Sequence, residues 1–256
     1  MSHVTCALNG ITPEQLDSRL RVTGIRESAP KLRQTLVRPV QGGGVRMICR
    51  ERESLTVTVR VALPEPDPAE RALLAEKLAA WAGDGLLTLT SRPDRRLRVR
   101  CTGLPGLEEL SDWSTPVTVT FMACEVPWWE DAEPTDVVLH SEERRSALVT
   151  VPGTAEETPV TARVTCLGDT LDTVLLLCGE TAVTLEGLGM TEGNVLLLRE
   201  DDTGRLCITV DGADRSACRT ADSDDRLLVK CGGIRGFSLT SDGTASAELE
   251  IRGRYL

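Results

Sequence analysis

Nine cysteines and two histidines are the residues of this 256-residue chain that could hold a metal or serve as nucleophile and base. Zinc sites pair their ligands at spacings of two to four residues. Here no two cysteines lie closer than eleven positions, and the histidines, His3 and His140, are far apart. The spacing predicts reduced thiols that pack as small apolar side chains, as the alternating contexts of Cys101 and Cys166 indicate. It predicts no metal site.

Three further segments resemble ligand sites in composition only. Residues 42–44 are all Gly, but Val45-Arg46 follows instead of the Lys-Ser/Thr of a phosphate loop, so we expect a plain loop. The acidic residues 222–225 lack the Gly and distal Glu of an EF-hand, which favours a solvated turn and leaves a weak calcium contact open. Residues 200–202 are interpreted as a charged hairpin tip.

Motifs for catalysis are missing as well. There is no Gly-x-Ser-x-Gly, and a triad would have to use a histidine at the terminus or at a domain junction. A carboxylate pair for glycoside hydrolysis stays open, because any two of 39 acids could meet in the fold. We therefore predict no catalytic, cofactor-binding or metal-ligating residues, and a protein that is not an enzyme.

Charge and aromatic residues divide the chain near residue 130. Residues 1–130 hold 17 Lys/Arg and 16 Asp/Glu, whereas residues 131–256 hold 12 and 23, which gives net charges of +1 and −11. All four Trp lie in the first part.

Acidic proteins are poor candidates for wrapping nucleic acid, so we expect no sequence-specific nucleic-acid binding. The longest apolar runs are strand-sized, and no secretory signal is visible, which predicts no membrane span and synthesis in the cytosol.

The first part is predicted to be mostly β with one helix. Residues 55–63 alternate apolar and polar side chains and are followed by Pro64-Glu65-Pro66. A helix is expected next, with Asp67 as N-cap in a capping box with Glu70, apolar Leu74, Leu78 and Trp81 on one face and Gly83 as a left-handed end. Glu70, Arg71, Glu76 and Lys77 are expected largely off that face.

A hairpin and a further strand complete this part. Strands 86–90 and 96–101 flank an expected turn at residues 91–94, and strand 117–123 follows. Alternation places Arg96, Arg98 and Arg100 outward. Two interpretations carry equal weight: a contact surface, or a solvated face that resists edge-to-edge aggregation.

The second part contains only strand and turn patterns. Short strands at this spacing predict an antiparallel sandwich. The expected strands are 147–151, 160–166, 173–178, 182–185, 195–199, 205–210, 227–231, 237–240 and 245–252.

The order of these segments resembles the phage distal tail proteins (Dit), the tail-tip hub of long-tailed phages of Gram-positive hosts. The features that carry the resemblance are the helix ending in Trp81, the strand pair around Pro93-Asp94-Arg95, and the closing Pro127-Trp128-Trp129. Residues 227–234 and the ending 248–256 match in outline. The Gly run at 42–44 and the many cysteines depart from the family pattern.

The resemblance implies a structural role without cofactors. Residues 1–136 would form a sandwich- or barrel-like ring domain, residues 139–246 a galectin-like sandwich, and the final strand, about 247–256, would pack back on the first domain. It implies a homo-hexameric ring with a central channel at the virion tail tip, assembled in the bacterial host cytoplasm. The partners it implies are the tail-tube protein, a tail-associated lysin or tail fibre protein, and receptor-binding proteins at the periphery; phage and prophage origins both stay open.

A carbohydrate-binding module for host adhesion is the alternative. Sugar-binding sites usually stack the sugar ring on an exposed aromatic side chain, and residues 130–236 contain no aromatic residue. We therefore expect the second domain to bind no simple sugar on its own.

Overall fold

The structure, a computed structural model, describes residues 4–28, 32–37, 46–52, 54–106, 116–124, 127–201 and 203–255; for 32–37 and 46–52 only the backbone is considered. The chain divides into two compact units, a first unit that ends at Trp129 and a second unit, Glu130–Tyr255. Each is described by itself. The expected mostly β class with antiparallel sheets is confirmed.

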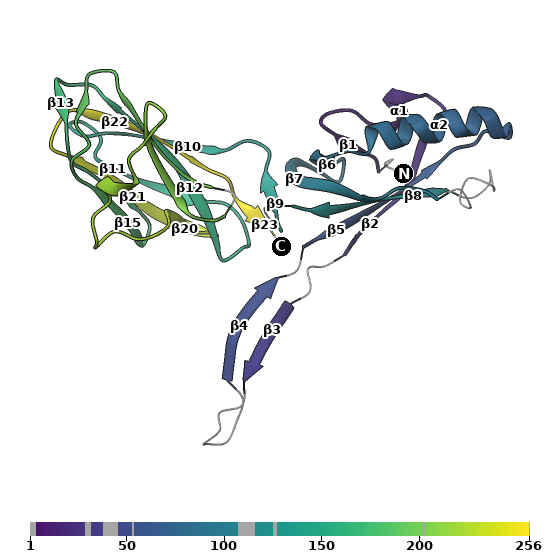
Figure 1. Cartoon of the computed structure of the whole chain (residues 1–256), viewed down its shortest axis with the longest axis horizontal. Coiled ribbons are helices and arrows are strands. Elements are labelled where there is room, and N and C mark those ends of the chain that lie inside the picture. Colours follow the sequence, from purple (N-terminus) through teal and green to yellow (C-terminus); the bar gives the residue numbers. More distant parts are fainter. Residues whose placement is uncertain are drawn as a thin grey trace. The chain divides into compact units, whose positions relative to one another are not determined.

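The first unit is built on one antiparallel sheet (Figure 1). Its strand order is β1-β6-β7-β8-β5-β2. Helix α2 (Pro68–Trp81) lies over one face of this sheet, and a one-turn helix α1 (Pro13–Leu16) lies near it. Strands β3 (Leu32–Val37) and β4 (Arg46–Arg52) pair with each other. The sheet strands are β1 (Cys6–Leu8), β2 (Arg21–Ser28), β5 (Thr56–Ala62), β6 (Gly85–Leu89), β7 (Arg92–Gly103) and β8 (Val117–Ala123).

Period-two alternation decides which face of the sheet meets the helix. Val57, Val59 and Val61 of β5 are fully buried, and their partners on β8 are at most 2% exposed. The helix contributes Leu74, Leu78 and Trp81. An amphipathic helix gains stability by covering the apolar face of a sheet, so this layer is the core of the first unit.

The helix departs from expectation at three points. Asp67 caps it as predicted, by accepting from the Ala69 N–H at 3.1 Å, but Glu70 binds Arg19 instead of completing a capping box. Gly83 does not take a left-handed conformation, since the chain leaves the helix through Ala82. Arg71 is buried rather than off the apolar face, because its guanidinium donates to the Glu65 carbonyl at 3.0 Å.

The turn predicted at residues 91–94 was wrong. Residues 90–91 make the turn, and Arg92 already pairs with Leu89 at the start of β7. The register then shifts, so that Leu97 pairs with Leu87. Residues 93–96 of β7 thus face the single residue Thr88 of β6, and a proline in such an irregularity costs no ladder bond although it lacks an N–H group.

The second unit contains two main sheets. One has the order β10-β22-β12-β17-β18-β19, with β20 also paired to β12; the other has the order β11-β21-β14-β15. All nine strands expected here are present. The strands are β10 (Thr135–His140), β11 (Ser146–Val151), β12 (Glu157–Cys166), β13 (Thr170–Leu171), β14 (Val174–Cys178), β15 (Thr181–Leu185), β16 (Met190–Thr191), β17 (Val195–Glu200), β18 (Leu206–Val210), β19 (Ala213–Asp214), β20 (Leu228–Lys230), β21 (Gly233–Ser241) and β22 (Ala245–Ile251), with a 3₁₀ turn at Ser216–Cys218.

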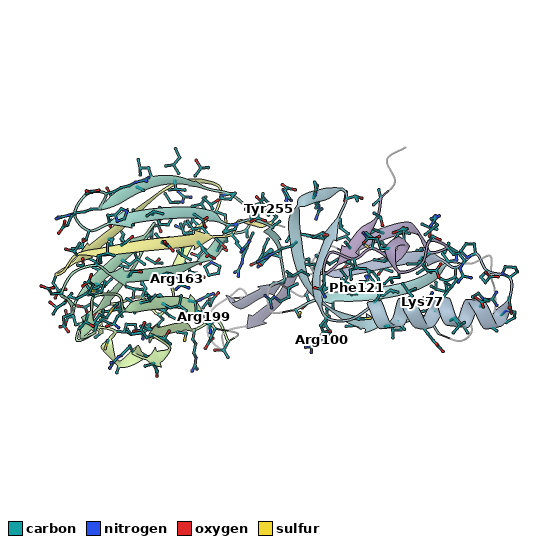
Figure 2. The ribbon with its side chains drawn as sticks, turned by 90° about the horizontal axis from the view of Figure 1, so that it is seen from above. Lys77, Arg100, Phe121, Arg163, Arg199 and Tyr255 are labelled. Carbon is teal, nitrogen blue, oxygen red and sulfur yellow. The ribbon has the colours of Figure 1, made fainter. Side chains whose placement is uncertain are left out.

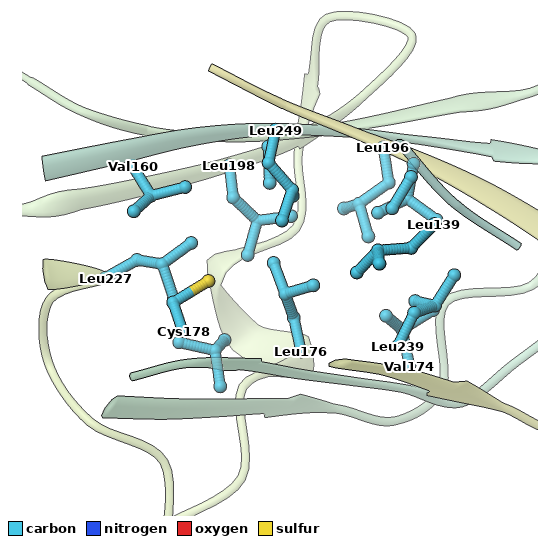
Figure 3. Packing of buried hydrophobic residues seen from close by; sticks show 14 of the residues in the cluster. Leu139, Val160, Val174, Leu176, Cys178, Leu196, Leu198, Leu227, Leu239 and Leu249 are labelled. Atoms are coloured by element: carbon cyan, nitrogen blue, oxygen red, sulfur yellow. The ribbon is translucent and has the colours of Figure 1, made fainter. Parts of the chain in front are cut away.

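Buried side chains from both sheets fill the space between them (Figure 3). Leu196, Leu198 and Leu249 extend from the larger sheet toward Leu176 and Cys178 of the smaller one. All five are at most 1% exposed. The predicted sandwich therefore has a continuous apolar core of its own.

The path expected for the final strand was wrong over most of its length. Strand β22 does not leave the sandwich: it lies between β10 and β12, with Leu249 opposite both Val137 and Ala162. Its alternating Ala245, Ala247, Leu249 and Ile251 are all buried in the core of the second unit. Only the short β23 (Arg254–Tyr255) continues beyond it, and it pairs with β9 (Trp129–Asp131).

Candidate functional site

Trp81, at the end of α2, ties three parts of the first unit together. Its indole N–H donates to the Ile11 carbonyl at 2.8 Å, and its ring meets Phe121 of β8 edge to face, with centroids 5.7 Å apart. A buried indole needs such a partner. This tryptophan therefore fixes the helix end to the sheet and to the segment before α1.

Two further sequence motifs meet at Glu27 of β2. The Trp129 indole N–H donates to its carboxylate at 2.8 Å, and Arg92 Nη1 lies 3.1 Å from each carboxylate oxygen. The Arg92 guanidinium also lies 5.2 Å from the centre of the Trp129 ring. Trp129 is 1% exposed, so this anchor fixes the last residue of the first unit. Sequence reasoning had no signal for Glu27, because its partners are 65 and 102 residues away.

The predicted row of arginines does not act as one group. Arg98 and Arg100 are exposed on β7 and alternate with the buried Leu97 and Val99, as predicted. Arg100 pairs with Asp84 at 3.1 Å in an exposed ion pair. Arg96 is half-buried beside the register shift, and Arg92 is engaged with Glu27.

Exposed arginines of β2 and β5, Arg21, Arg26 and Arg60, lie on the same face as Arg98 and Arg100. Arg60 of β5 alternates with the buried Val59 and Val61, and Arg26 of β2 lies opposite Thr58 of β5. Their strands are neighbours in the sheet, and β8 separates β5 from β7. We define the basic sheet face by Arg21, Arg26, Arg60, Arg98 and Arg100. The alternation of residues 55–63 places Arg60 outward, so the sequence carried a signal for β5, but it carried none for the irregular β2.

At the other end of the chain, the last described residues contact the start of the second unit. Asp131 accepts from the Gly253 N–H at 3.0 Å and from the Tyr255 hydroxyl at 2.8 Å. Arg252 donates to the carbonyls of Asp131 and Ala132, and Arg254 pairs with Glu130 at 3.3 Å. We call this set, residues 130–132 with 252–255, the terminal clamp.

Glu14 of α1 is a half-buried polar link in the first unit. It accepts from the Val22 N–H at 3.0 Å and from the Thr5 hydroxyl at 3.1 Å. Burial alone would raise its pKa, but these hydrogen bonds outweigh burial and lower the pKa below its ordinary value. Burial and the neighbouring Glu14 charge raise the pKa of the Cys6 thiol to about 12.

The other candidates have structural surroundings. Cys166 and Cys178 are buried, and burial raises the pKa of Cys178 to about 12, which makes this thiol a poor nucleophile at neutral pH. Cys101 is half-buried at a register shift rather than fully inward. His140 ends β10 opposite Ser246. His3 and the Gly run at 42–44 lie outside the described residues.

The acidic segments stabilise turns. Asp224 accepts from the Ala182 N–H at 2.7 Å, and Asp225 pairs with Arg219 at 2.9 Å. Asp201 accepts from the backbone N–H groups of Thr203 and Arg205, while Glu200 pairs with Arg226. Within the residues that the structure describes, no three His, Cys, Asp or Glu side chains group as metal ligands, and no helix has the length and apolar character of a membrane span.

Comparison with solved structures gives a match over nearly the whole chain. The crystal structure of the Dit protein of phage SPP1, described as a paradigm of the hub adsorption apparatus in phages that infect Gram-positive bacteria, superposes with a TM-score of 0.69 at 16% identity, covering 97% of this chain and 98% of that one. Chains of the phage p2 baseplate in its activated conformation, with strontium or with calcium, match at TM-scores of 0.48 and 0.47, with 11% and 12% identity and 98% and 97% coverage of the two chains in both cases. No family model and no curated protein sequence matches this chain.

The resemblance inferred from sequence is thus confirmed at the level of the fold: this chain has the fold of the SPP1 Dit protein. The three motifs that carried the resemblance have structural roles here. Trp81 fixes α2, and the segments around Arg92 and Trp129 meet at Glu27.

Proposed function

We propose that this protein is a structural component of a phage or prophage tail, acting as a hub at the distal end of the tail. The observation that carries the proposal is the match to the SPP1 Dit protein across both units. A shared fold alone leaves function open. The anchors formed by Trp81 and by Glu27 with Arg92 and Trp129 add support, because these residues hold the elements that the sequence resemblance singled out.

The hub would be a homo-hexameric ring formed by the first unit, around residues 1–136, with the acidic second unit outside. A head-to-tail ring brings two different patches of the same subunit together, which a unit with both charge signs allows. The second part, with a net charge of −11, would repel its copies if they met at a shared axis. Such a ring would link the tail-tube protein to a tail-associated lysin or fibre protein and hold receptor-binding proteins at its periphery.

The test is the oligomeric state of the full chain. Light scattering over a range of concentrations, followed by electron-microscope class averages, should show a six-fold ring, alone or after addition of the tail-tube protein of the same phage or prophage. A monomer at high concentration that forms no ring even with that partner would contradict the hub proposal. The variant Arg163→Gln serves as a control and should form the same ring as the unaltered chain, because this exposed side chain of the second unit lies outside the proposed ring domain.

The carbohydrate-binding alternative gains no support from the second unit. The ring of Phe237 is buried in the core, and the Tyr255 hydroxyl is engaged by Asp131 in the terminal clamp. Neither ring is a free platform for sugar stacking. A glycan array probed with the full chain should give no specific, saturable binding.

A further inference from the structure

Strand β11 forms an open edge of the smaller sheet of the second unit. It pairs with β21 on one side, and no strand in the part of the chain that the structure describes pairs with its other side. The opposite edge of the same sheet, β15, is covered. There the Asp224 N–H donates to the Ala182 carbonyl at 2.9 Å, and the Thr220 N–H donates to the Thr184 carbonyl at 3.1 Å.

The ladder shows which residues of β11 direct their backbone groups to the open side. The Gly179 N–H donates to the Gly236 carbonyl at 2.8 Å, so Gly236 of β21 directs its backbone groups toward β14. Opposite residues of an antiparallel ladder either exchange hydrogen bonds or both direct them away from each other. Leu148 lies opposite Gly236, so its N–H and C=O point to the open edge. Ser146 and Thr150, two residues to either side, share this direction.

The open edge of β11 lacks the features that usually prevent pairing. Edge strands of soluble proteins are protected by charged side chains, a proline, a bulge or a short length. Residues 146–151 are Ser-Ala-Leu-Val-Thr-Val, without charge or proline, and their register with β21 runs over six pairs without a shift. A regular, uncharged edge of this kind is suited to the addition of another strand.

Leu148, at the centre of this edge, has no side chain opposite it within the sheet. Its neighbour on β21 is Gly236, and the Leu148 side chain is 80% exposed. Ile234, the diagonal neighbour on β21, is 66% exposed. Cross-strand contacts between side chains stabilise sheets. The open side of β11 is therefore where Leu148 can gain such a contact.

The outward face beside the open edge is uncharged. Strands β11, β14 and β15 contain no charged residue, and Arg235 of β21 alternates with the outward Gly236 and donates to the Lys230 carbonyl at 3.1 Å. The larger sheet differs, because Arg163 of β12 and Arg199 of β17 are exposed on its outward face (Figure 2). A charged partner finds no complement at β11. A second copy of this acidic chain can meet it there without opposing like charges on the paired strands.

We propose that β11 pairs with the β11 of a second copy, antiparallel about a two-fold axis at Leu148. This register uses all three open positions, since Leu148 lies opposite its own copy and Ser146 lies opposite the second copy's Thr150. Each hydrogen-bonded pair exchanges two bonds, and the leucine pair and the two Ser–Thr pairs are favourable cross-strand contacts. The charged residues that precede the strand, 142–145, stay at opposite ends of the paired strands, with the two copies of residue 145 about 20 Å apart.

The contact is small, which sets its strength. Six paired residues span about 20 Å, and a contact one strand wide covers well under the roughly 800 Å² per partner of a stable dimer. Pairing is therefore weak and depends on a high concentration of the chain. Neighbours in a head-to-tail ring are not related by a two-fold axis, so this contact joins separate chains or separate assemblies. The inference does not rest on the proposed ring.

The first experiment cross-links the full chain through introduced cysteines under mild oxidation. Leu148→Cys should give a covalent dimer on a non-reducing denaturing gel, because opposed Cα atoms about 5.5 Å apart suit a disulfide. Thr150→Cys is the matched control, since its two copies would lie about 14 Å apart and should give at least about tenfold less dimer. Mixing Ser146→Cys with Thr150→Cys should restore the cross-link. The unaltered chain gives the background from the native cysteines.

The second experiment measures self-association of the full chain by sedimentation. Leu148→Glu places like charges opposite each other, so the dissociation constant of the pairing should rise at least about tenfold. Leu167→Glu makes the same change at a 48% exposed leucine outside β11 and should leave association within twofold. Added salt should not weaken the pairing of the unaltered chain, because no ion pair holds it. Thermal unfolding is checked for each variant.

Three results would overturn the inference. The first is a Leu148→Cys chain that gives no more dimer than the unaltered chain. The second is equal cross-linking by Leu148→Cys and Thr150→Cys, which would show random collision rather than this register. The third is equal weakening by Leu148→Glu and Leu167→Glu, which would show that only net charge matters. A ring without the cross-link contradicts only this inference, and the cross-link without a ring contradicts only the hub.

Discussion

Glu27 connects two distant motifs of the first unit, so its loss should destabilise that unit. Its carboxylate serves both a buried indole and a guanidinium, so Glu27→Ala leaves two donors without their partner. We expect the free energy of unfolding to fall by about 2–3 kcal/mol, measured by urea denaturation. Glu76→Ala, an exposed change on α2, is the control and should cost less than about 0.5 kcal/mol. Equal effects would contradict the anchoring role.

Glu14 predicts a dependence of stability on pH. Its pKa is lowered in the folded chain, so the ionised form stabilises the fold above the ordinary pKa of a glutamate, and this stabilisation is lost as the pH falls through that range. Glu14→Gln should cost about 1–2 kcal/mol at pH 7 and clearly less at pH 3. Urea denaturation at both pH values measures the difference. A cost that does not change with pH would exclude the charged link to Val22 and Thr5.

Gly253 is required by close packing within the terminal clamp. A Cβ atom there would lie 2.5 Å from the Asp131 carboxylate and 2.9 Å from the backbone carbon of Pro152. Gly253→Ala should therefore destabilise the second unit by about 2 kcal/mol in thermal or urea unfolding. Gly236→Ala, whose Cβ would meet only an ordinary contact at 3.8 Å, is the matched control in the same unit.

At the scale of elements, the sequence predicted those that depend on local periodicity. Strand β8 was predicted with the same bounds, and α2 was recognised from Asp67, Pro68 and its apolar face. Helix α1 was missed although Thr12-Pro13-Glu14-Gln15 carries a helix-start signal, since one turn has too few residues for periodicity to appear. Strand β2 has an irregularity between Val22 and Gly24 that breaks its alternation.

Contacts between distant segments account for what could not be predicted. The meeting of Glu27, Arg92 and Trp129 joins three segments across 102 residues, and no local pattern encodes it. The path of β22 was misjudged because its short apolar face fits burial against either unit equally well. The pairing of β22 with both β10 and β12 places it in the second unit. Sequence patterns indicated only part of the basic sheet face, because its arginines come from three different strands.

The contacts of the terminal clamp predict what truncation of the C-terminal segment would do. Removing residues 252–256 deletes the partners of Glu130, Asp131 and Ala132, all of which belong to the second unit. The second unit should lose stability, seen as faster exchange of its backbone amide hydrogens, while the amides of the first unit keep their exchange rates. Loss of protection confined to the first unit would restore the earlier expectation that the final segment packs there.

At the scale of the whole molecule, two cores imply two unfolding units. The cluster that includes Leu176 contains residues of the second unit only, whereas Leu78 is buried under the sheet of the first. Leu176→Ala and Leu78→Ala should each cost about 2–5 kcal/mol, and in calorimetry of the full chain each should lower a different transition. A single transition lowered equally by both changes would contradict separate units.

The terminal clamp also decides how the molecule responds to mechanical load. Because residues 130–132 and 252–255 are bonded to each other, tension applied between the two ends of the second unit acts first on these hydrogen bonds and ion pairs. The sandwich, with its ladder from β10 through β22 to β12, lies outside that path while the clamp is intact. Tension applied between residues 130 and 255 is therefore carried by the clamp itself. The sheets of the second unit bear this tension only after the bonds of the clamp have broken.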